Sequence, residues 1–102
     1  MGYKSKFARP DIDELFAGIL TLETIEDCYR FFEDICTINE IHAISQRLHV
    51  AKLLTQKKTY SEIEKMTSAS TATISRINKC LMYGADGYKL VLNKLGIEEE
   101  TE

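Results

Sequence analysis

Short polar and cationic side chains gather between residues 71 and 79, at spacings that place them along one side of a helix. Ala72 and Ser75 are small enough to let a helix backbone approach a surface closely, and Arg76 and Lys79 can donate to phosphate oxygens or to guanine. The apolar residues of the stretch recur three and four positions apart and predict its buried side: Ile74, Ile77 and Leu81. This combination is typical of a helix that lies in the major groove of DNA.

A second, shorter helix is predicted just before this one. Thr59 and Glu62 have the spacing of a capping box, which marks a helix start. Residues 68–70 (Ser-Ala-Ser) are small and suit a tight turn, and the last serine or the threonine after it can cap the following helix. Two short helices joined by about three small residues predict a helix-turn-helix over about residues 59–82.

The charge of the chain is unevenly distributed. The net charge is -3, but residues 1–39 carry four Lys and Arg against eight Asp and Glu, residues 40–83 seven against three, and residues 84–102 two against five. A basic middle segment between acidic ends can present one positive face to phosphates. The residues that we predict to contact DNA are Thr71, Ala72, Thr73, Ser75, Arg76, Lys79, Ser61, Lys57 and Lys58.

The elements that would position these side chains are all predicted to be helical. There is one proline, at Pro10, and no useful stretch alternates with the period of a strand. We expect an all-α chain of about six helices in a single domain over residues 1–102, with an acidic tail, residues 98–102, that frays. The expected helices are residues 12–20, 22–36, 38–56, a short helix from Thr59, 71–81 and 87–95. Asp11 with Glu14 marks the start of the first helix, and Thr37 with Glu40 marks the start of the third. Asp86 marks the start of the last helix, and Gly96 marks its end.

The third predicted helix has an unusually wide apolar stripe. Ile41, Ile44, Leu48 and Ala51 make one line along it, and three further apolar residues widen that line: Val50, Leu53 and Leu54. A chain of 102 residues with 44% apolar residues has a limited core of its own. We therefore expect a homodimer in which a second copy covers part of this helix.

No stretch is apolar enough to span a membrane, and the first residues lack the apolar core of a signal peptide. The three cysteines, Cys28, Cys36 and Cys80, show no close pairing, which indicates reduced thiols. We expect a cytoplasmic protein with no membrane partner.

Two other kinds of chemistry are disfavoured by the sequence. His42 and His49 share a helix face with Cys36 nearby, but no CxxC, no HExxH and no suitably spaced carboxylate completes a metal site. No nucleophile beside a base, no phosphate-binding glycine loop and no paired carboxylates suggest catalysis. We therefore expect no enzyme activity, no catalytic residue, no metal and no cofactor.

Two segments carry a family resemblance: residues 45–50 (Ser-Gln-Arg-Leu-His-Val) and residues 72–76 (Ala-Thr-Ile-Ser-Arg). Residues 41–95 resemble the Trp repressor superfamily, and the whole chain resembles its small TrpR-related bacterial proteins of the YerC/YecD type. The resemblance implies six helices, of which the first, second, third and last are interwoven between two subunits. It also implies helix-turn-helix units that project from this core and bind double-stranded DNA.

The resemblance further implies a ligand pocket in which two arginines, Arg47 and Arg76, flank the indole of tryptophan, with Thr37 as another pocket residue. Two positions depart from that pattern. Ile77 stands where the Trp repressor has glycine, and Cys80 stands where it has a serine. Because the isoleucine side chain can occupy the indole space itself, we expect no response to tryptophan and leave the effector unassigned.

The function that follows is a sequence-specific transcriptional regulator, and a repressor by resemblance. The alternative is a dimeric helical module that binds another protein, through its acidic first helices for example, without specific DNA binding. The two can be told apart because the logarithm of the affinity for DNA falls linearly with the logarithm of the salt concentration.

Overall fold

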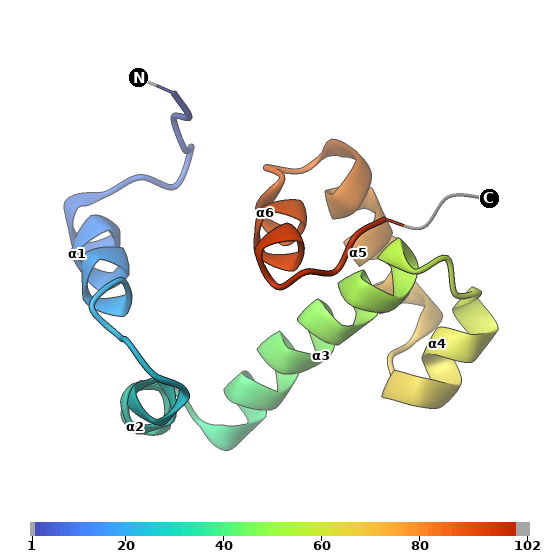
Figure 1. Ribbon diagram of the computed structural model, residues 1–102, viewed down its shortest axis with the longest axis horizontal. Coiled ribbons are helices and arrows are strands. Elements are labelled where there is room, and N and C mark those ends of the chain that lie inside the picture. Colours follow the sequence, from blue (N-terminus) through green and yellow to red (C-terminus); the bar gives the residue numbers. More distant parts are fainter. Residues whose placement is uncertain (1, 100–102) are drawn as a thin grey trace. The chain divides into compact units, whose positions relative to one another are not determined.

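The computed structural model describes residues 2–99, and this part of the chain contains six helices and no strand. The helices are α1 (Pro10–Ile19), α2 (Ile25–Ile35), α3 (Ile38–Thr55), α4 (Tyr60–Thr67), α5 (Thr71–Tyr83) and α6 (Gly87–Lys94) (Figure 1). The prediction of an all-α chain with about six helices is confirmed. The predicted fraying of residues 98–102 falls mostly on residues 100–102, which lie outside the described residues.

The chain divides into two compact units, Met1–Ile38 and Asn39–Glu102. The first holds α1 and α2, and the second holds α3, except for its first residue, together with α4, α5 and α6. That both belong to one domain stays a prediction. Among the described residues, no helix combines the length and the apolar character needed to cross a membrane.

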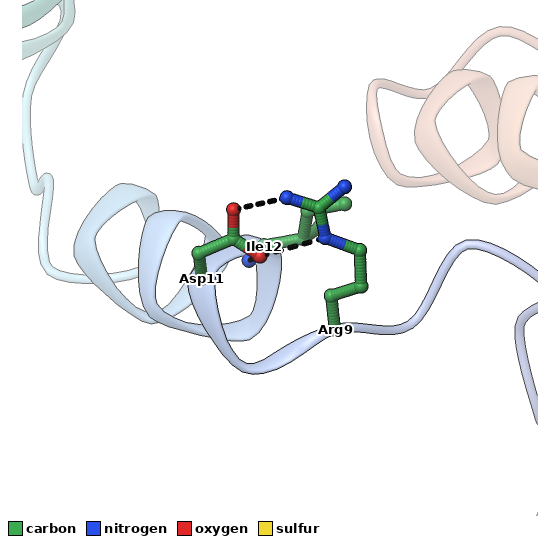
Figure 2. A network of polar contacts seen from close by, with 3 residues as sticks. All are labelled: Arg9, Asp11 and Ile12. Atoms are coloured by element: carbon green, nitrogen blue, oxygen red, sulfur yellow. Dashed lines mark hydrogen bonds and ion pairs between the residues drawn. The ribbon is translucent and has the colours of Figure 1, made fainter.

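In the first unit, α1 begins at Pro10, whose fixed φ suits the first position of a helix. The side chain of Arg9 donates to both carboxylate oxygens of Asp11, at 3.0 and 2.6 Å, and one of these oxygens also accepts from the Ile12 N–H (Figure 2). The predicted capping box of Asp11 and Glu14 is therefore wrong, because Asp11 lies inside the helix and bonds to Arg9. The Arg9 side chain lowers the pKa of Asp11 from its ordinary value.

The second helix of this unit begins later than predicted. Thr24 caps α2 by accepting a hydrogen bond from the Asp27 N–H at 3.0 Å, and Asp27 accepts from the Glu23 N–H at 3.1 Å. No described residue of the unit is buried, although α1 and α2 carry large apolar side chains. Ile25 and Tyr29, on α2, are 77% and 65% exposed. The first unit therefore has apolar faces that its own residues do not cover.

The second unit contains the buried core. Its fully or nearly fully buried side chains come from all four helices and from the turn between α4 and α5: Val50, Ala51, Leu53, Ile63, Ala69, Ile74, Ile77 and Leu92. Leu48, Leu54, Leu81, Tyr88 and Ile97 pack against them. Burial of apolar surface is the dominant stabilising contribution to a core of this kind, so α3, α4, α5 and α6 stabilise one another.

Both α3 and α6 are followed by a residue with a left-handed backbone conformation, which ends the helix. Lys57 has φ 63° after α3, and the Lys57 and Lys58 N–H groups donate to Leu54 and Leu53 carbonyls at 3.0 Å. Gly96, at φ 83°, ends α6 with the same hydrogen-bond pattern, so the predicted stop at Gly96 is confirmed. Asp86 precedes α6 as predicted, but its side chain makes no capping hydrogen bond.

Candidate nucleic-acid interface

A complete capping box starts α4. The Thr59 hydroxyl accepts from the Glu62 N–H at 3.1 Å, and the Glu62 carboxylate accepts from the Thr59 N–H at 2.8 Å. The predicted start is thus confirmed. The hydrogen bond from the Thr59 backbone N–H is the main cause that lowers the pKa of Glu62, and the Thr59 hydroxyl adds to it.

The capping box gives a prediction about pH. Because the pKa of Glu62 is lower in the folded chain than in the unfolded chain, its ionised carboxylate contributes stability above the unfolded pKa, and this contribution is lost as pH falls through the folded pKa. We expect wild type to exceed Glu62→Gln in free energy of unfolding near pH 6 and the difference to shrink below about pH 4. Urea unfolding at a series of pH values measures this, and a difference that stays constant with pH would contradict it.

The turn between α4 and α5 is short, and hydrogen bonds and a buried alanine hold it in place. Ser68 adopts the left-handed conformation, with φ 62° and ψ 13°, and its N–H donates to the Glu64 carbonyl at 2.9 Å. Ala69 is buried, at 4% exposure, and Ser70 caps α5 by accepting from the Thr73 N–H at 3.1 Å. Of the two caps that the sequence allowed, Ser70 is the one formed.

A contact that the sequence did not predict joins this turn to α3. The Gln46 side chain donates to the backbone carbonyl of Thr67, the last residue of α4, at 3.0 Å. This hydrogen bond satisfies a carbonyl at a helix end, where carbonyls lack partners within the helix. Gln46 therefore holds the end of α4 against α3, and nothing in the sequence distinguishes this glutamine from the other polar residues of the helix.

The two sides of α5 differ as predicted. Ile74 and Ile77 are 0% and 3% exposed and belong to the core. Ala72, Arg76 and Lys79 are exposed. The helix thus has one side held by the core of the second unit and another side of small and cationic residues that is open to a partner.

The remaining predicted contact residues differ in their exposure and in their side-chain partners. Ser61 and Lys58 are exposed, and Ser75 is half-buried. Thr73 is half-buried, and its hydroxyl accepts from the Ser70 hydroxyl at 3.1 Å. Lys57 is paired with Glu99, at 3.6 Å between Nζ and a carboxylate oxygen.

Thr71 is exposed at the first position of α5, and its hydroxyl donates to the carboxylate of Glu64 on α4. This partner was not predicted from the sequence. All nine predicted contact residues belong to the second unit, and seven of them lie on α4 or α5.

Comparison with known proteins identifies the family. Residues 10–96 match the Trp repressor protein family. The chain belongs to the Trp repressor family. The uncharacterized protein YerC of Bacillus subtilis (strain 168) is 52% identical over 97 residues, which are 95% of this chain and 92% of YerC. The predicted resemblance to TrpR-related proteins of this type is therefore confirmed.

Two solved structures share the fold of this Trp repressor family member. One is a Trp repressor-like protein from Staphylococcus aureus, with a TM-score of 0.88 and 50% identity, covering 93% of this chain and 95% of that chain. The other is a TrpR-like protein from Eubacterium eligens ATCC 27750, with a TM-score of 0.88 and 49% identity, covering 93% and 98%. Family membership indicates a helical DNA-binding regulator of transcription.

In this family member, four of the five predicted ligand-pocket residues lie in the second unit. Arg47, Arg76 and Cys80 are exposed, whereas Ile77 is buried in the core. Thr37 lies in the first unit, and its place relative to the other four stays a prediction.

Tyr88, on α6, lies near two of the predicted ligand-pocket residues, Arg47 and Cys80. It was not identified from the sequence. Burial of its phenol raises the pKa of Tyr88, the Cys80 thiol adds to the rise, and the Arg47 guanidinium opposes it. Tyr88 is thus within electrostatic range of both Arg47 and Cys80.

A cavity of about 400 Å³ lies elsewhere in the second unit. Its lining combines apolar side chains with lysines and asparagines: Leu54, Thr55, Lys57, Asn78, Leu81, Met82, Lys89, Leu92, Asn93, Ile97 and Glu99. None of the predicted ligand-pocket residues lines it.

Proposed function

We propose that this Trp repressor family member is a sequence-specific DNA-binding regulator of transcription, and a repressor, in which α4 and α5 act as a helix-turn-helix. The observation that carries the proposal is the division of α5 into two sides. Ile74 and Ile77 are buried, while Ala72, Arg76 and Lys79 are exposed. A helix that enters the major groove needs such a small, cationic face.

The support of α5 is as important as its exposed residues. Contacts with bases must be held in place, because ordering a mobile helix on binding would lower the affinity. Here the buried isoleucines, the Ser70 cap and the hydrogen bond from Gln46 to Thr67 fix α5 and the turn before it. The excess of seven Lys and Arg over three Asp and Glu in residues 40–83 adds attraction to phosphates.

A selection from random duplexes, followed by affinity measurements at several salt concentrations, tests this proposal. We expect one enriched sequence, and a logarithm of affinity that falls linearly with the logarithm of salt concentration. If nothing is enriched and affinity for bulk DNA at low salt is negligible, the helical protein-interaction module becomes the better description.

We also propose that the protein acts as a homodimer. The described residues of α1 and α2 leave large apolar side chains uncovered, with Ile25 77% and Tyr29 65% exposed. Exposed apolar surface of this kind is typical of an interface. Two helix-turn-helix units related by a two-fold axis would select half-sites about one helical turn, roughly 34–36 Å, apart. A single, unrepeated half-site in the same selection would contradict the dimer.

We propose, third, that the regulator does not respond to tryptophan. The side chain of Ile77 is buried at the position where the resemblance places a glycine beside the indole, and Tyr88 lies within electrostatic range of Arg47 and Cys80. Thermal unfolding with increasing L-tryptophan tests this, since a ligand that binds the folded state raises the midpoint with concentration. We expect no rise, and a rise that depends on concentration would overturn the proposal.

A further inference from the structure

A carboxylate is held beside the first turn of α5. The Glu64 side chain, exposed on α4, accepts a hydrogen bond from the hydroxyl of Thr71, the first residue of α5. The backbone carbonyl of Glu64 accepts from the Ser68 N–H at 2.9 Å in the turn between the two helices. Glu64 therefore contacts both the turn and α5, and its carboxylate has a defined place on the proposed DNA-binding face.

The charge of this carboxylate is compatible with the fold. A helix N-terminus favours a nearby negative charge, and the Glu64 carboxylate lies at the first residue of α5. None of the ion pairs found among residues 2–99 involves Glu64. The carboxylate is thus available to a partner, and at the same time it repels the phosphates that Arg76 and Lys79 would attract.

The hydrogen bond also decides what the two side chains can offer to a base. An ionised carboxylate only accepts hydrogen bonds, and a hydroxyl that donates its proton to Glu64 has only acceptor lone pairs left. Guanine presents the acceptors N7 and O6 in the major groove, and thymine presents the acceptor O4. Glu64 and Thr71 therefore disfavour these bases and favour an amino group, which cytosine and adenine provide.

Cytosine fits better than adenine. The adenine amino group lies between two acceptors in the groove, its own N7 and O4 of the paired thymine, either of which would repel the second carboxylate oxygen. The cytosine N4 amino group has an acceptor on one side only, O6 of the paired guanine. We propose that Glu64 is a specificity-determining residue that selects cytosine at one position of the bound site. This inference rests on the proposed function, because it requires that α5 lies in the major groove.

The test is selection from random duplexes with the full-length wild type and with Glu64→Gln. Wild type is expected to prefer cytosine about tenfold at one position. Glutamine keeps an acceptor for Thr71 but adds a donor, and it pairs with adenine N6 and N7, so the variant is expected to prefer adenine at that position. Glu98→Gln, which makes the same charge change outside α4 and α5, should keep the wild-type preference.

A second variant tests the role of the hydrogen bond. Thr71→Val keeps the shape of the side chain but removes the hydroxyl, and we expect it to reduce the cytosine preference several-fold while leaving the salt dependence unchanged. Circular dichroism confirms that each variant is folded. If wild type selects a site and Glu64→Gln selects the same bases at every position, this inference is wrong and the proposed function stands. If wild type selects no site, the proposed function itself fails.

Discussion

Replacing Ile74 by alanine is expected to lower the free energy of unfolding by about 2–5 kcal/mol. Ile74 is 0% exposed and belongs to a core that includes residues of α3, α4, α5 and α6. Truncation removes the transfer free energy of the deleted methyl groups and leaves a cavity between these helices. Since folded domains are stable by only about 5–15 kcal/mol, the variant should lose a large part of its stability. Under conditions close to its unfolding transition it should also lose DNA binding, because only the folded chain binds.

Urea unfolding followed by circular dichroism measures this effect. Ile74→Val removes one methyl group, and we expect it to cost about 0.5–1.5 kcal/mol. Lys65→Ala, at an exposed position of α4, should change stability by less than about 0.5 kcal/mol. If the cost of Ile74→Ala is no greater than that of Lys65→Ala, then Ile74 is not a core residue and α5 is not supported as described.

Replacing Arg76 by alanine is expected to weaken DNA binding about tenfold, which is the cost of removing one charged hydrogen-bonding group from the interface. Arg76 is exposed on the side of α5 opposite the buried Ile74 and Ile77, so its removal takes away a positive charge without opening the core. The slope of log affinity against log salt should fall by about 1 for each phosphate that the variant no longer neutralises, and Lys79→Ala should behave likewise.

Fluorescence anisotropy with a labelled duplex at several salt concentrations measures both quantities. Lys94→Ala makes the same charge change at the end of α6, outside α4, the turn and α5, and should leave the affinity nearly unchanged. Unfolding curves of Arg76→Ala and Lys79→Ala should coincide with wild type within about 0.5 kcal/mol. If the three variants lose affinity equally, then binding depends on total charge and α5 is not the contact surface.

Much of the fold could be predicted because its signals are local. The three-and-four spacing of apolar residues located the six helices, and Ile74 and Ile77 are buried on the predicted side of α5. The capping box of Thr59 and Glu62 and the stop at Gly96 also follow from interactions within a few residues. Such interactions depend little on the rest of the chain.

The errors occurred at the starts of two helices, α1 and α6. Asp11 was predicted to cap α1, but Pro10 begins the helix and Asp11 bonds to Arg9 instead. Asp86 precedes α6 without a capping bond from its side chain. At Asp11 the residue types allowed more than one set of hydrogen bonds, and sequence spacing does not rank their energies. Asp86 has a left-handed backbone, with φ 66° and ψ 15°, and not the extended backbone that a capping side chain needs.

The small, cationic face of α5 was thus determined by the sequence alone, since residue types and a helical period are enough to place Ala72, Arg76 and Lys79 on one side. What only the tertiary structure decided is how that face is held and which charges surround it. The bonds from Gln46 to Thr67 and from Thr71 to Glu64 join different helices, and Ile77 shares its core with residues from all of α3, α4 and α6. Contacts between residues far apart in the chain depend on how the helices pack, and the period of a single helix carries no information about its neighbours.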